Sequence, residues 1–141
     1  MRRRSRWIWL ILALLTVGFI FSNSLPSIPD SRAQSSRVLE LLEPLFAVFV
    51  GENVVTLHFV RKLAHFVEFG ALGVELGFLY ARRSAAPFLT ALLVALSDET
   101  IQIFAQRGSQ VKDVWLDFSG ASTGIVVSLL FLHLLRRKNR K

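Results

Sequence analysis

Ionisable residues recur inside long apolar segments of this sequence, and their types suit acid–base chemistry. His65-x-x-Glu68 places two metal-capable groups, an imidazole and a carboxylate, about one helical turn apart, and Asp98 or Glu99 could complete an oxygen-rich site. The metal signal is weak, because the signature of a zincin helix is absent. A carboxyl group buried beside other acids can serve as a general base or a proton carrier. These four are therefore the candidate catalytic residues: His65, Glu68, Asp98 and Glu99.

A second set of polar residues suits the binding of a phosphate group. Arg61, Lys62 and Arg107 can bind phosphate, the two arginines through paired hydrogen bonds. Nearby carboxylates and an amide would then orient hydroxyl groups or balance charge. The predicted ligand-binding residues are Arg61, Lys62, Gln102, Arg107, Asp113 and Asp117.

The sequence carries few other signs of a reaction. It has no zincin helix, no nucleophilic triad and no glycine-rich phosphate loop, and its 141 residues contain no cysteine. We therefore expect no metal and no cofactor, and whether the protein is an enzyme stays open. Nucleic acid is not expected as a partner, because the net charge of +7 forms no continuous basic face.

The elements that must position these residues are membrane-spanning helices. Hydrophobic residues make up 52% of the chain and gather in blocks long enough to cross about 30 Å of hydrocarbon. The sequence predicts an all-α, polytopic membrane protein of one domain, residues 1–141, with a loop at 22–34. The predicted elements are four transmembrane helices, at about 7–22, 59–81, 85–104 and 113–135, and one short amphipathic interfacial helix at about 35–50.

Two of these segments allow a second interpretation. The basic start and the apolar run from Trp7 to Phe21 also describe a signal peptide, although no small-x-small cleavage site follows. We favour an uncleaved helix. The segment at 35–50 carries charges and Pro44, so it is too polar to span; it could lie on the membrane or simply cover the bundle.

Basic residues predict the orientation. Eleven of the 17 lysines and arginines lie on one side: four before Trp7, Arg82 and Arg83 in a turn, and five after Leu135. Because short cytoplasmic segments are enriched in basic residues, both termini are expected in the cytoplasm.

Helical spacing then collects the polar residues into one pocket. At about 100° per residue, His65, Glu68 and Glu75 share an arc of about 80°. In the predicted orientation the acidic and polar candidate residues all lie in the outer half and Glu75 alone lies deep, so the pocket would open to the extracytoplasmic face. Gly70, Gly73 and Gly77 form another stripe, and Gly120-x-x-x-Gly124 a third, which suit close helix packing or a homodimer.

Three blocks of residues resemble the VanZ-like family over nearly the whole chain. They are Phe21-Ser22-Asn23-Ser24-Leu25-Pro26 with Ser35-Ser36, Arg61-Lys62-x-x-His65-Phe66-x-Glu68-Phe69-Gly70-x-Leu72-Gly73, and Asp98-Glu99-x-x-Gln102-x-Phe104-x-x-Arg107 followed by Lys112-Asp113-x-x-x-Asp117-Phe118-Ser119-Gly120-Ala121. Two positions depart from the family pattern. Ala105-Gln106 stands where the family commonly has Pro-Gly, and Phe69 stands where a tyrosine is usual. The resemblance implies a bacterial inner-membrane protein of the cell envelope. The family is named for a member associated with resistance to teicoplanin, a glycopeptide antibiotic, and resistance is not assumed for this chain.

Three functions from different classes fit these observations. The preferred one is binding or processing of an envelope lipid or a lipid-linked glycan phosphate at the outer leaflet, motivated by the basic rim above the acids. The second is a structural protein whose polar groups lock the helices or dock another membrane protein. The third is an ion or proton pathway, which has few polar groups in its cytoplasmic half.

Overall fold

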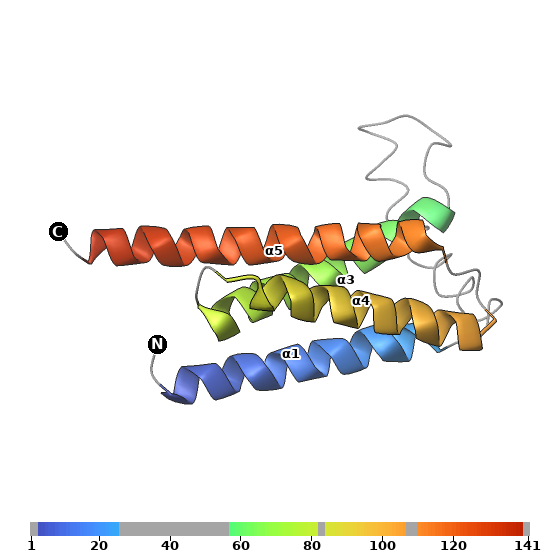
Figure 1. The fold of residues 1–141 in the computed structure, drawn as a ribbon, viewed down its shortest axis with the longest axis horizontal. Coiled ribbons are helices and arrows are strands. Elements are labelled where there is room, and N and C mark those ends of the chain that lie inside the picture. The colour runs from blue at the N-terminus through green and yellow to red at the C-terminus, as the bar shows by residue number, and fades with distance from the viewer. Residues whose placement is uncertain (1–2, 26–56, 82–83, 107–109, 140–141) are drawn as a thin grey trace.

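The computed structural model describes residues 3–25, 57–81, 84–106 and 110–139, which form four long helices (Figure 1). These helices are α1 (Arg3–Ser24), α3 (Leu57–Tyr80), α4 (Ala86–Phe104) and α5 (Val111–Lys138). The described residues contain no strand, and all four helices are long and apolar enough to cross a membrane. The predicted all-α fold with four spans is therefore confirmed. The expected amphipathic helix at 35–50 lies outside the described residues.

The ends of the helices differ from the sequence prediction at two places. α1 continues to Ser24, whereas a loop was expected from residue 22. The helix tolerates these polar residues because the Ser22 hydroxyl donates to the Phe19 carbonyl oxygen (2.7 Å) and Ser24 has a partner on another helix. α5 continues to Lys138, and its last turn carries Arg136, Arg137 and Lys138, whose charges favour a helix C-terminus.

Local signals explain where α3 ends and where α4 begins and ends. Pro87 lies in the first turn of α4, where its missing N–H costs nothing. Ala81 follows α3 with φ 48° and Gln106 follows α4 with φ 54°, so both residues occupy the left-handed region that commonly ends a helix. At Gln106, where the family commonly has glycine, a residue with a side chain adopts the conformation that glycine favours.

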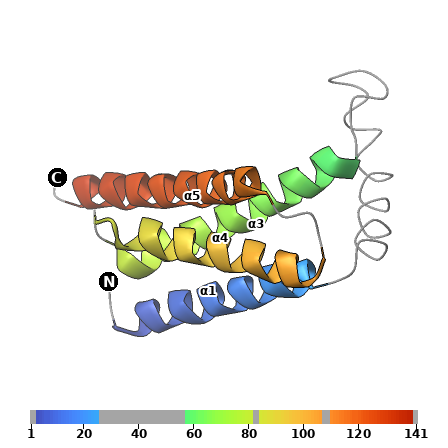
Figure 2. The same cartoon turned by 45° about the vertical axis from the view of Figure 1, so that its right-hand side comes forward.

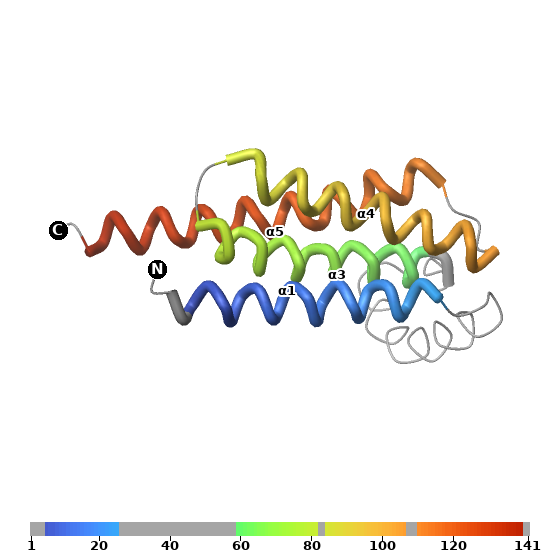
Figure 3. The backbone as a smooth tube through the Cα atoms, turned by 60° about the horizontal axis from the view of Figure 1, so that its bottom comes forward, coloured from blue at the N-terminus to red at the C-terminus, as the bar shows by residue number. Residues whose placement is uncertain are grey.

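The four helices lie side by side, with α3 packed against each of the other three. α1 and α5 lie on opposite sides of α3, and the two termini lie at the same end of the bundle (Figures 1 and 3). We call this the basic end, because it carries Arg6 and Arg136 to Lys138. At the opposite end α1 and α4 finish and α3 and α5 begin (Figure 2); we call it the polar end.

Small residues bring α3 and α5 into backbone contact. A Cβ atom on Gly73 would overlap the Ala121 carbonyl oxygen, and one on Gly124 would lie 2.7 Å from the Val74 nitrogen. Gly77 faces Ser128 in the same way. The predicted glycine stripes therefore pack against each other within one chain. We call this contact, which forms within one chain, the glycine seam.

The apolar and polar residues of the bundle are inverted relative to a water-soluble protein. Large apolar side chains point outward on every helix, for example Leu15 on α1, Val67 on α3, Leu93 on α4 and Leu134 on α5, each at least 60% exposed. Several acids are buried instead, including Asp98, Glu99 and Asp117. Water would not favour this arrangement but hydrocarbon does, so the helices belong to a multi-pass membrane protein.

Candidate functional site

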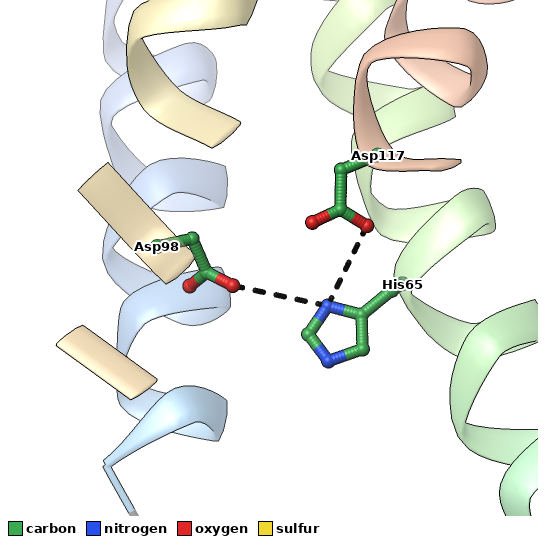
Figure 4. A group of neighbouring side chains, drawn as sticks. All are labelled: His65, Asp98 and Asp117. Carbon is green, nitrogen blue, oxygen red and sulfur yellow. Dashed lines mark ion pairs between the residues drawn. The ribbon is translucent and has the colours of Figure 1, made fainter. Parts of the chain in front are cut away.

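The polar end contains a buried cluster of three side chains from three helices. His65 on α3 lies between Asp98 on α4 and Asp117 on α5 (Figure 4). Its Nδ1 atom is 4.0 Å from Asp98 Oδ2 and 4.0 Å from Asp117 Oδ1. One nitrogen or oxygen atom from each residue lies within 4.8 Å of the others. The sequence placed these residues at one depth, and the structure adds that they converge.

Asp98 is fixed by hydrogen bonds from two helices. The Ser24 hydroxyl at the end of α1 donates to Asp98 Oδ1 (2.7 Å), and Gln102 Nε2, one turn further along α4, donates to Oδ2 (2.8 Å). The same amide group is 3.5 Å from Glu99 Oε1. Asp98 has no exposed surface, so these donors compensate for the loss of water around its carboxylate.

Asp117 is as deeply buried as Asp98 but is not satisfied in the same way. Its exposed fraction is 1%, and neither carboxylate oxygen accepts a hydrogen bond from the described residues. Its contact is the ion-pair distance to His65, which exceeds hydrogen-bonding range. A buried carboxylate without hydrogen bonds is costly, so this group calls for an explanation.

The remaining predicted residues surround this cluster. Lys62 Nζ pairs with Asp113 Oδ1 at 2.9 Å across α3 and α5, and both side chains are partly exposed. Arg61, immediately before Lys62 on α3, is half-buried, and the described residues give it no ion pair. Glu68 accepts a hydrogen bond from Asn23 Nδ2 (3.0 Å). Arg107 lies outside the described residues.

Sequence reasoning missed the contribution of α1. Three of its polar residues bind acids on other helices: Thr16 donates to Glu75 (2.9 Å), Asn23 to Glu68, and Ser24 to Asp98. Asn23 and Ser24 were assigned to a loop. One feature of the sequence could have indicated this role. Thr16 lies within the apolar run of the first span, and Asn23 and Ser24 lie directly after it; polar residues at such positions are expected to have partners on other helices.

The geometry permits two kinds of chemistry at the polar end. An imidazole between two carboxylates can hold a proton or coordinate a cation. Lys62 and Arg61, nearer the start of α3, can attract an anion to the same end. The cluster touches solvent through His65, whose side chain is 17% exposed, so a small ion or a ligand group can reach it.

An all-α bundle of four apolar helices with buried acids at one end defines a class of polytopic membrane protein. Within that class, the model of the VanZ/LLP1 family matches residues 7–132, and the chain belongs to this family. No curated protein and no solved structure matches the chain.

Proposed function

We propose that this VanZ/LLP1 protein binds the phosphate-bearing head group of an envelope lipid or a lipid-linked glycan at its polar end. The observation that carries the proposal is the pairing of basic residues at the start of α3 with the acidic cluster one to two turns deeper. Arg61 and Lys62 would contact the phosphate. Gln102, Asp113 and Asp117 would then contact hydroxyl groups or balance charge.

The length of α5 supports a position of the polar end at the level of the lipid head groups. Trp115, 63% exposed, and Arg136 are separated by 21 residues, or about 32 Å of helix. This matches the roughly 30 Å of a hydrocarbon core with an aromatic anchor at one boundary and a basic one at the other. Phe59 and Phe104 are also exposed at the polar end. Asp117, two residues from Trp115, would lie about 3 Å inside that boundary.

The distribution of basic residues supports an extracytoplasmic position for the site. Arg136, Arg137 and Lys138 lie at the basic end, which is expected to face the cytoplasm of a bacterial inner membrane. Because the chain lacks cysteine, single cysteines introduced at Gln110 and Asn139 can be labelled selectively. In intact spheroplasts, an impermeant maleimide should label Gln110→Cys and spare Asn139→Cys; the reverse pattern would place the site on the cytoplasmic side.

Native mass spectrometry in mild detergent tests the lipid proposal. Wild-type protein should retain a phospholipid or a polyprenyl-phosphate glycan, and Arg61→Gln/Lys62→Gln should lose at least about tenfold in occupancy, since two charged contacts are removed. The matched control is Arg136→Gln/Arg137→Gln, which removes two charges at the basic end. Equal occupancy in both double variants, or a wild type without lipid, would contradict the proposal.

The hydrogen bonds made by α1 favour a second candidate, a structural role for part of the polar network. Glu68 and Glu75 each accept a side-chain hydrogen bond from α1. On this alternative the acids lock helix packing or a docking surface for another membrane protein. Glu68→Gln would then lower the melting temperature without changing lipid occupancy.

A further inference from the structure

We propose that His65, Asp98 and Asp117 form a binding site for one divalent transition-metal ion, Zn²⁺ or Mn²⁺, held between α3, α4 and α5. This inference goes beyond lipid binding and does not depend on it. It also differs from the expectation drawn from the sequence, which was that the protein binds no metal. The three donors come from helix positions that are 33 and 19 residues apart along the chain, so no local spacing motif could reveal them.

The donor set defines the class of ion. An imidazole nitrogen with two carboxylate oxygens suits Zn²⁺ and Mn²⁺, whereas Mg²⁺ and Ca²⁺ prefer oxygen donors alone. Two carboxylates and a neutral imidazole carry a charge of about −2, which a divalent ion balances inside the bundle.

The distances fit a site that closes slightly on its ion. Donors at about 2.1 Å from a tetrahedral metal lie roughly 3.4 Å from one another. The two separations from His65 Nδ1 are 4.0 Å, so each donor must move by a few tenths of an ångström. All three side chains point toward the space between them (Figure 4), so closing needs no change of rotamer.

The unsatisfied carboxylate of Asp117 is the observation that separates this proposal from a simple acidic cluster. The side chain is 98% buried, aims at His65, and accepts no hydrogen bond from the part of the chain that the structure describes. A metal ion would satisfy it. A protonated His65 alone would bring the opposite charge but, at 4.0 Å, no hydrogen bond.

The residues around Asp98 resemble the support that metal ligands need. Ser24 and Gln102 fix both of its oxygens, and each carboxylate oxygen keeps a second lone pair for a metal. Such outer contacts orient ligands and tune their affinity. Three protein ligands leave at least one coordination position for water or an anionic group.

The test is metal binding by purified protein in mild detergent, with any tag removed and endogenous metal stripped by EDTA. Isothermal titration with Zn²⁺, Mn²⁺ and Mg²⁺ alone should give one site per chain for Zn²⁺ or Mn²⁺, at least about tenfold tighter than for Mg²⁺. Asp117→Asn and His65→Gln should each weaken that site at least about tenfold. The matched control is His133→Gln, which changes an exposed histidine on α5 near the basic end.

Metal-stripped variants should first be shown to be monodisperse and helical. If Asp117→Asn fails that check, His65→Gln alone is compared with the wild type. Electron paramagnetic resonance of Mn²⁺ bound to ¹⁵N-histidine-labelled wild type detects nitrogen coordination directly. The proposal is overturned by a wild type that binds no ion tightly, by variants that keep wild-type affinity, or by equal loss in His133→Gln. Unchanged lipid occupancy in Arg61→Gln/Lys62→Gln, or a wild type that retains no lipid, would reject the proposed function; with metal binding intact, either result would leave this site standing.

Discussion

The helices α3 and α5 meet in two regions that use opposite means of close association. In the glycine seam, the absence of side chains lets Gly73 and Gly124 contact the facing backbone. Nearer the polar end, Asp117 on α5 and His65 on α3 approach to 4.0 Å without a hydrogen bond. In the first region the two backbones pack directly against each other. In the second, buried polar atoms accept no hydrogen bond from the described residues.

This difference separates what stabilises the bundle from what is available for function. Backbone contact in the seam gains dispersion energy and needs no ligand. A buried carboxylate without hydrogen bonds lowers stability, and proteins retain such groups mainly where function requires them. Three substitutions test the contrast, from the largest expected effect to the smallest.

Gly73→Ala should disrupt the seam most strongly. The added methyl group would overlap the Ala121 carbonyl, which belongs to the backbone of a facing helix and cannot rotate away. We expect a loss of about 3 kcal/mol or more in the free energy of unfolding, measured by SDS titration in mixed micelles. Gly70→Ala is the control: its Cβ would lie 3.7 Å from the Gly120 oxygen, so it should be neutral within about 1 kcal/mol. Equal loss in both variants would contradict the seam.

Ser24→Ala should have an intermediate effect. It removes the hydroxyl that donates to the fully buried Asp98 and leaves one carboxylate oxygen without that donor. The expected loss is about 1–3 kcal/mol in the same assay. Ser22→Ala, two residues away on the same helix, removes an exposed hydroxyl bound only to its own helix and should change stability by less than about 0.5 kcal/mol. A neutral Ser24→Ala would show that α1 does not support the cluster.

Asp117→Asn should have the smallest effect and the opposite sign. In EDTA-treated protein the substitution removes a buried charge that accepts no hydrogen bond from the described residues, while preserving side-chain size. We expect stability to rise by about 1 kcal/mol. Asp113→Asn instead breaks the partly exposed pair with Lys62 and should lower stability by less than about 1 kcal/mol. Strong destabilisation by Asp117→Asn would mean that Asp117 already has a stabilising partner.

The sequence allowed the spans and the glycine stripes to be predicted because both depend on local order. Hydrophobic length and the period of the helix identify four spans and place Gly70, Gly73 and Gly77 on one stripe. The partners of the acids could not be read in this way. Thr16 meets Glu75 across 59 residues, and Ser24 meets Asp98 across 74.

Convergence of His65, Asp98 and Asp117 was predictable only in part. Their shared depth follows from the order and length of the helices, but their rotation toward one point depends on how α3, α4 and α5 pack. That packing is set in part by the glycine seam, which fixes the rotation of α5 against α3. Asn23 and Ser24 were assigned to a loop because their composition is typical of one, and tertiary hydrogen bonds overrode that local preference.

The hydrogen bonds from α1 also have a consequence for biogenesis. Synthesis delivers α1 first, so the hydroxyl and amide groups of Thr16, Asn23 and Ser24 can already be in the membrane when the acids of α3 and α4 arrive. A charged acid costs about 2.5–3.5 kcal/mol at the centre of an inserting helix and less toward its ends, so a partner already in the membrane lowers the cost most for the deep Glu75. We therefore expect α1 to aid the insertion of α3 and α4, whereas Asp117, which arrives later on α5, has no hydrogen bond from α1 among the described residues.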